Sequence, residues 1–173
     1  CPHHCYNCFN PETWDYNGGK EFTQEVIHDI LERCKSENIS GLSILGGDPL
    51  IPRNFQQLNL LITQFKEELP EKTIWVWTGY TFHELVTKMA NCRIGDTNEW
   101  ALLNDILCSI DVLVDGPFVE AKKNLKLLHR GSSNQRVIDM KKTIEKIQQI
   151  RFKSYRISDT INQYDHCIVL YEE

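Results

Sequence analysis

Three cysteines stand within the first eight residues of the chain, at Cys1, Cys5 and Cys8, in a CxxxCxxC spacing. Thiolates select zinc or iron–sulfur clusters in proteins. A structural zinc site is closed by four ligands, whereas a four-iron cluster held by three thiolates keeps one iron open for a further ligand. The spacing therefore predicts a metal centre with two interpretations. It is a 4Fe-4S cluster, or a zinc site of three cysteines and one histidine, His3 or His4.

The other cysteines are dispersed, so the seven in the sequence do not form a disulfide framework. An odd count with one tight cluster is typical of metal ligation in a reducing compartment, and we expect a cytoplasmic protein. Cys34 lies on the apolar face of a predicted helix and is expected to be a small core residue. The remaining three are Cys92, Cys108 and Cys167.

The composition is that of an ordinary globular protein, with 41% hydrophobic and 25% charged residues among 173. No apolar run approaches the roughly 20 residues that span a bilayer, and no signal segment opens the chain, so no membrane partner is expected. The formal net charge is -5, and the lysines and arginines are scattered. No nucleic-acid partner is expected, because such partners require a basic patch or stripe.

Short apolar runs at residues 42–45, 74–78 and 111–115 predict buried strands. Between them, apolar residues recur at helical spacing, and Thr81 with Glu84 forms a capping-box signature. Strands that alternate with helices indicate the α/β class with a parallel sheet.

In such sheets, ligands bind beyond the carboxyl ends of the strands. The turns at Gly46, Gly79 and Gly116 are therefore expected to share one rim. Thr78 and Asp115 stand at strand ends on this rim and are expected site residues. Trp75 and Trp77 alternate along a strand, which places them in the core or against a ligand. One further helix and a terminal strand at 167–171 are expected beyond Val137.

The stretch from Cys1 to Trp14, CPHHCYNCFNPETW, resembles the signature of radical S-adenosylmethionine (SAM) glycyl-radical activating enzymes. In that family CxxxCxxC is followed by one residue and Asn, here Asn10, and then by Trp. The resemblance implies that the three cysteines hold a 4Fe-4S cluster and that Phe9 and Asn10 contact SAM. At the position of Asn7, many radical SAM proteins carry an aromatic residue that lies near the adenine of SAM. In this chain the resemblance assigns that role to Phe9.

The turn Gly46-Gly47-Asp48-Pro49 resembles the GGDP or GGEP element of the same family, which contacts the amino group of SAM. Glycine lets a backbone approach a ligand closely, although many strands end in a glycine turn without any ligand. The turn follows a predicted strand about 40 residues after the cysteine loop, as in the family. The resemblance implies that all four residues bind SAM.

Three further stretches, at 75–81, 111–118 and 130–136, resemble the activating proteins of anaerobic ribonucleoside-triphosphate reductase. This resemblance implies reductive cleavage of SAM and transfer of the radical to a glycine of anaerobic ribonucleotide reductase. It also implies an electron donor such as flavodoxin or ferredoxin. Activation of another glycyl-radical enzyme and a non-catalytic zinc-binding module remain as alternatives.

The family's fold implies an incomplete (β/α) barrel, with its first strand upstream of Cys1. Residues 1–136 are expected to form the radical SAM domain. Residues 137–173 are expected to form a C-terminal extension, a helix and a strand, packed on the same domain.

Overall fold

The computed structural model describes residues 1–91, 97–153 and 168–171. Its helices are α1 (Gln24–Cys34), α2 (Phe55–Glu68), α3 (Phe82–Ala90), α4 (Thr97–Ser109) and α5 (Met140–Lys153). Its strands are β1 (Gly41–Ile44), β2 (Thr73–Trp77), β3 (Val112–Asp115) and β4 (Arg136–Asp139). Single-turn 3-10 helices are η1 (Pro11–Trp14), η2 (Pro52–Asn54) and η3 (Glu120–Lys122). The α/β class is confirmed.

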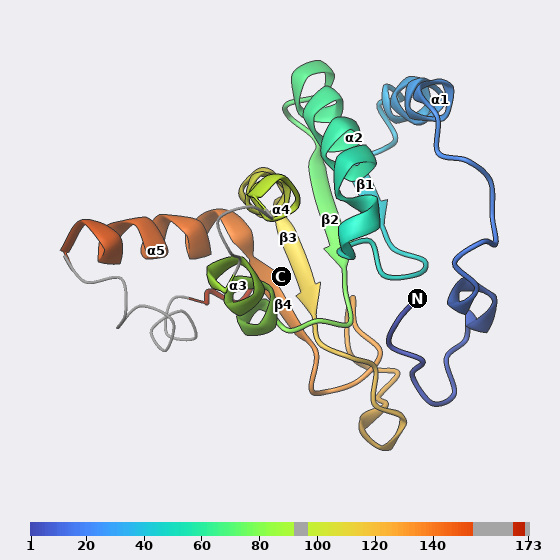
Figure 1. Cartoon of the computed structure of the whole chain (residues 1–173), viewed down its shortest axis with the longest axis vertical. Coiled ribbons are helices and arrows are strands. Elements are labelled where there is room, and N and C mark those ends of the chain that lie inside the picture. The colour runs from blue at the N-terminus through green and yellow to red at the C-terminus, as the bar shows by residue number, and fades with distance from the viewer. Residues whose placement is uncertain (92–96, 154–167, 172–173) are drawn as a thin grey trace.

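The described strands form one open, mixed sheet in the order β1-β2-β3-β4 (Figure 1). β1 pairs with β2 and β2 with β3 in parallel, which confirms the predicted parallel units. β4 was not predicted; it pairs antiparallel to β3, with Asp115 opposite Arg136. The incomplete barrel and its strand upstream of Cys1 stay predictions.

The helices cover one face of the sheet, where α2 and α4 pack against each other (Figure 1). Their apolar residues recur at the spacing that places one face of a helix on a core. Thr23 caps the start of α1, its hydroxyl accepting from the Val26 amide at 3.4 Å. Fully buried core residues from these helices and the sheet include Ile27, Leu31, Phe55, Ile62, Phe65, Ile74, Val76, Leu103, Ile106 and Leu113.

The opposite face of the sheet carries a smaller cluster, in which Trp75 and Trp77 pack beside Val112, Val114 and Val137. The two indole rings stack with centroids 5.7 Å apart. Both tryptophans are only partly buried. They therefore have a packing role on this face, as one of the two interpretations expected.

The C-terminal residues 168–171 lie along β4. The Asp139 amide donates to the Val169 carbonyl at 2.8 Å, and Leu170 forms an isolated antiparallel bridge with Ile138. A terminal strand was expected at 167–171, and the structure has only these contacts at 168–171. Cys167 and Cys92 lie outside the described residues. Because β4 spans residue 136, it crosses the expected division of the chain, which stays a prediction.

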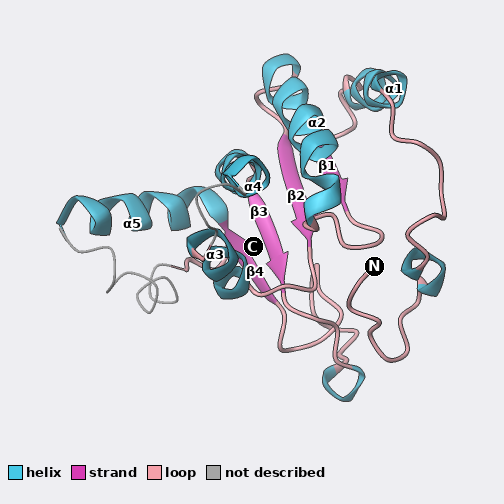
Figure 2. Cartoon of the chain, in the orientation of Figure 1, coloured by secondary structure: helices cyan, strands magenta, loops and turns pink. Residues whose placement is uncertain are grey.

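The turns after the parallel strands meet at one end of the sheet, as predicted. The Gly79 amide donates to an Asp48 carboxylate oxygen at 2.8 Å, and the Gly116 amide donates to the Tyr80 carbonyl at 2.9 Å. The first 23 residues reach this rim as a long loop, interrupted by η1 (Figure 2). Within the described residues, no helix is both long enough and apolar enough to cross a membrane.

Candidate cofactor site

The cysteine loop turns its three thiols inward. Cys1, Cys5 and Cys8 are each half-buried with free thiols, whereas most residues between them are exposed. His4 and Asn7 have φ angles of 44° and 61°, in the left-handed region, and these two residues reverse the chain between the cysteines. The Cys8 amide closes the second turn by donating to the Cys5 carbonyl at 3.1 Å.

The three thiols form a donor set that fits an iron–sulfur cluster. The Asn10 amide donates to the Cys8 sulfur at 3.4 Å, the kind of contact that tunes the potential of a cluster. Among the described residues, no group of three or more His, Cys, Asp or Glu side chains converges on one point for a metal ion. Zinc and a four-iron cluster both need thiolates gathered around one centre, so this finding applies equally to both.

The Gly46–Pro49 turn lies directly against the cysteine loop. A Cβ atom built on Gly47 would lie 3.6 Å from Thr13 Cβ and 3.8 Å from Cys1 Cβ. A pocket of about 590 Å³ opens here, with Cys1, Gly47 and Asp48 all in its lining. The structure thus brings together two motifs that stand about 40 residues apart in the sequence.

The Asp48 carboxylate is buried and engaged by protein donors. Oδ1 accepts from the Leu50 amide at 2.8 Å, and Oδ2 accepts from the Gly79 amide at 2.8 Å. The Thr78 hydroxyl lies 2.9 and 3.0 Å from the two oxygens. His3 Nε2 lies 2.5 Å from Oδ2. A carboxylate offers about four lone-pair sites, so Asp48 has little capacity left for a ligand.

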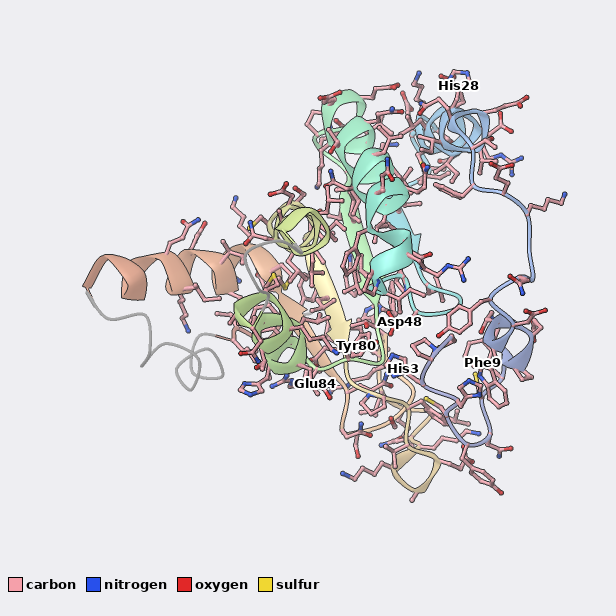
Figure 3. All side chains as sticks on the ribbon, viewed as in Figure 1. His3, Phe9, His28, Asp48, Tyr80 and Glu84 are labelled. Carbon is pink, nitrogen blue, oxygen red and sulfur yellow. The ribbon has the colours of Figure 1, made fainter. Side chains whose placement is uncertain are left out.

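His3 lies close to Asp48 and Tyr80, which stand in the turns after β1 and β2 (Figure 3). Its ring meets that of Tyr80 edge to face, with centroids 4.6 Å apart. A Cβ on Gly79 would lie only 2.4 Å from His3 Cδ2, so this position requires glycine. Burial, and next the charge of Asp48, raise the pKa of Tyr80.

Asp115, the other predicted acid, lies at the end of the next strand and is also engaged. Arg136 binds it with two hydrogen bonds, Nε to Oδ1 at 3.0 Å and Nη2 to Oδ2 at 2.5 Å. The Phe82 amide donates to the same carboxylate at 2.7 Å. Asp115 therefore ties β3, β4 and the start of α3 together.

Phe9 is not brought to the glycine turn. Its side chain is 91% exposed, and Figure 3 shows it apart from His3 and Asp48. Asn10 is half-buried, and its carbonyl accepts from the Thr13 hydroxyl at 2.8 Å. The expected SAM contacts of both residues stay predictions.

The stretch at 130–136 is held by hydrogen bonds from its own side chains. Gln135 Oε1 accepts from the Gly131 and Ser132 amides at 2.9 and 3.1 Å, and Arg130 donates to the Gln135 carbonyl at 3.1 Å. The Trp77 indole donates to the His129 carbonyl at 2.7 Å, beside this loop. Arg130 and Arg136 both bind protein groups, so neither is simply a surface charge.

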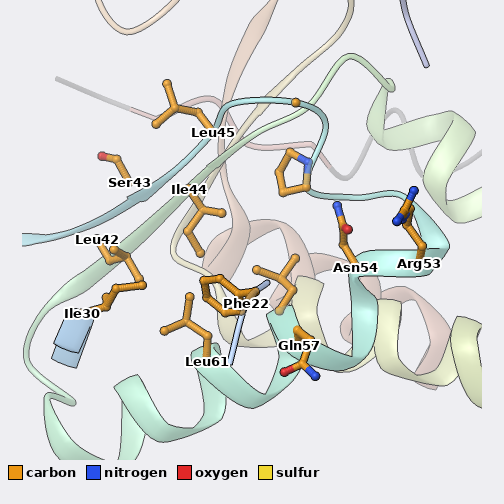
Figure 4. A pocket seen from close by; sticks show the side chains of 13 residues that line it. Phe22, Ile30, Leu42, Ser43, Ile44, Leu45, Arg53, Asn54, Gln57 and Leu61 are labelled. Atoms are coloured by element: carbon orange, nitrogen blue, oxygen red, sulfur yellow. The ribbon is translucent and has the colours of Figure 1, made fainter. Parts of the chain in front are cut away.

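A second pocket, of about 390 Å³, lies beside β1 on the side away from β2 (Figure 4). Its lining is mostly apolar, with Phe22, Leu42, Ile44 and Leu61 among its residues. It contains no thiol and no carboxylate, and it meets the first pocket at Gly47.

Sequence reasoning missed three contributors to this region: the anchoring contact of His3, the requirement for Gly79, and the pairing of Arg136. In the zinc interpretation, His3 was one of two histidines that could supply the fourth ligand. Its partner comes from a strand end 45 residues away, which no local pattern signals. The one available signal was that His3 stands between two cysteines on a loop expected near the Gly46 turn.

The chain belongs to the class of proteins with a 4Fe-4S single cluster domain, whose family model matches residues 1–138. Comparison with curated relatives identifies a more specific family within this class. The relative from Vibrio cholerae is 40% identical over 137 residues, covering 78% of this chain and 79% of the relative. The relative from Escherichia coli K12 is 39% identical over the same length, and that of phage T4 is 34% identical over 139 residues, covering 79% of this chain and 77% of the relative.

Each of these relatives is named an anaerobic ribonucleoside-triphosphate reductase-activating protein. The chain belongs to this family. No solved structure matches it significantly.

Proposed function

We propose that this chain is a radical SAM activase that cleaves SAM reductively at a 4Fe-4S cluster and generates a glycyl radical on anaerobic ribonucleotide reductase. The observation that carries the proposal is the contact between the cysteine loop and the Gly46–Pro49 turn at the carboxyl ends of parallel strands. Membership of the reductase-activating family supports the choice of partner.

The roles divide between thiols and backbone. Cys1, Cys5 and Cys8 would hold the cluster as thiolates. The backbone of Gly46 and Gly47 would receive the amino acid end of SAM, while Asp48, Pro49 and Thr78 hold the turn in place. When bound, the reduced cluster and SAM together supply the one-electron chemistry that removes a hydrogen atom from a glycine Cα. The protein supplies orientation and exclusion of water.

We also propose that the sheet is part of an incomplete (β/α) barrel. In the described residues the outer edge of β1 has no strand partner, and the apolar pocket of Figure 4 lies along it. Both features support a further strand on that side. Residues 1–136 would form the radical SAM domain, and the pairing of β4 with β3 supports packing of residues 137–173 on it.

The reductase would dock on the rim formed by the loops after Gly79 and Gly116. The second of these loops supports this placement, because Leu125 is 90% exposed and Lys122, Lys123 and Lys126 surround it in sequence. An exposed apolar side chain among cations suits a partner surface with an apolar centre and acidic rim. Radical transfer requires direct contact between the two reacting groups, and positioning dominates such reactions.

The electron would come from a donor such as flavodoxin or ferredoxin, in the cytoplasm. Thiolate ligands require a reducing compartment. A cluster on a surface loop that a donor can reach is also within reach of oxygen, so the activity is expected under anaerobic conditions.

The test combines the reduced, iron-loaded chain and SAM with an anaerobic ribonucleotide reductase that carries deuterium at glycine Cα. The expected results are deuterium in 5'-deoxyadenosine and a glycyl radical signal on the reductase by electron paramagnetic resonance (EPR). The matched control is Cys5→Ala, which should give neither.

If SAM is cleaved but both signals require a formate-lyase-type partner, the partner assignment fails and the activase assignment stands. If the anaerobically prepared chain holds stoichiometric zinc and no iron, the activase proposal is refuted.

A further inference from the structure

The contact between His3 and Asp48 joins the cysteine loop to the sheet. His3 lies between two of the cysteines, and its side chain is 16% exposed, while that of Asp48 is 1% exposed. In the described part of the chain, no other side-chain hydrogen bond links residues 1–10 to the sheet or to the turns that follow its strands. The position of the loop therefore depends strongly on this contact.

Three residues surround the imidazole ring of His3. Gly79 leaves room for the ring at its Cα, Tyr80 contacts its edge, and Asp48 accepts from Nε2. The same carboxylate accepts from the Leu50 amide inside the turn. One buried carboxylate thus fixes His3 and the Gly46–Pro49 turn to the same point.

We infer that His3 is a positioning residue, which sets the distance between the cluster held by the cysteine loop and SAM held by the glycine turn. This inference rests on the proposed function. It also gives a role to Asp48, the acidic residue of the turn. Its carboxylate holds the cysteine loop through His3 and does not bind SAM directly. The Nε2 of His3 is engaged by Asp48, which leaves only Nδ1 able to act as a ligand, and the iron content of His3→Leu tests that alternative.

The first experiment uses the full chain without its cluster. In His3→Leu, the loop loses a hydrogen bond to a charged group, and alkylation of Cys5 and Cys8 by iodoacetamide should accelerate roughly tenfold. Cys34 is the internal reference, because it is buried in the core and burial raises the pKa of its thiol. His28→Leu, the same change at an exposed position on α1 far from the site (Figure 3), should alter no rate.

The second experiment uses the anaerobically reconstituted chain. His3→Leu should retain about four irons per chain and the EPR signal of the reduced cluster. The change that SAM makes in that signal should be lost, or should require roughly tenfold more SAM. His3→Gln, whose amide can donate to Asp48, should restore part of the response.

The outcomes separate the two hypotheses. Unchanged labelling of Cys5 and Cys8 in His3→Leu would overturn the positioning role, whatever the function. Loss of iron in His3→Leu to the level of Cys5→Ala would make His3 a ligand and also overturn it. If the unsubstituted chain holds four irons but its EPR signal ignores SAM, the proposed function falls, and the inference falls with it even when the labelling result is positive.

Discussion

Two adjacent glycines in the turn after β1 have different physical roles, and alanine at each position tests the SAM assignment. Gly47 has no positive φ, and its added Cβ would meet Thr13 and Cys1 at 3.6–3.8 Å, which is ordinary van der Waals contact. Gly47→Ala should therefore fold normally, with a free energy of unfolding equal to or about 0.4–1 kcal/mol above that of the unsubstituted chain. Its iron content should also be unchanged.

SAM binding should nonetheless weaken in Gly47→Ala, because a methyl group would stand between the backbone and the ligand. Loss of one hydrogen bond to a charged group, about 1.5–3 kcal/mol, corresponds to a Kd at least roughly tenfold higher. The assay is calorimetric titration of the reconstituted chain with SAM, alongside urea unfolding of both proteins. Equal affinity in the two proteins would refute the assignment of this turn to SAM.

Gly46→Ala is the matched control. Gly46 has a φ of 129°, and nothing lies within 4 Å of its added Cβ, so the substitution is conformational rather than steric. Alanine there should lower the free energy of unfolding by about 1–3 kcal/mol. The expected pattern is therefore loss of stability at Gly46 and loss of SAM affinity without loss of stability at Gly47.

Three further predictions concern ligation, packing and pH. Cys5→Ala should abolish the brown iron–sulfur absorbance, whereas Cys34→Ala should retain it, since that thiol is a core residue. Arg136→Ala should lower the free energy of unfolding by about 3 kcal/mol in urea titrations, because it leaves the buried carboxylate at the end of β3 without its cation. Hydrogen bonding to the Thr81 backbone lowers the pKa of Glu84, so this residue stabilises the fold above its unfolded pKa and ceases to do so as the pH falls through its folded value. Gln can keep the capping hydrogen bond and Glu84 is exposed, so Glu84→Gln should cost about 0.3–0.5 kcal/mol at pH 7 and nothing in acid, and an equal cost at both pH values would contradict this.

The parallel part of the fold could be predicted because its signals are local. Each of the first three strands is a short apolar run that ends at a glycine turn, and the Thr81 capping box marks α3 in the sequence and in the structure. β4 could not be predicted in this way. Its four residues, Arg136–Asp139, form a strand only because β3 lies beside them, and that pairing is invisible in a local window.

The sequence predicted the motifs of the candidate site, but it did not predict which side chains contact one another there. The handedness and order of parallel strands bring Gly46, Gly79 and Gly116 to one rim, and the structure confirms that expectation. The pairing of Asp115 with Arg136 depends on the register between β3 and β4. The partner of His3 likewise depends on how a loop without regular structure folds back over two strand ends.

Asp48 and Asp115, the two acidic residues predicted for the site, both bind neighbouring parts of the protein. Asp48 binds the cysteine loop to the ends of β1 and β2, and Asp115 binds β4 and α3 to the end of β3. The pocket beside Cys1 and Gly47 is also lined by other polar side chains, among them Thr13, Lys20 and Arg53. A loss of activity in Asp48→Asn would therefore not identify a SAM ligand. In an Asp48→Asn background, His3→Leu should add little further loss, because Asp48→Asn already breaks the His3 contact, whereas two independent SAM contacts would show additive effects.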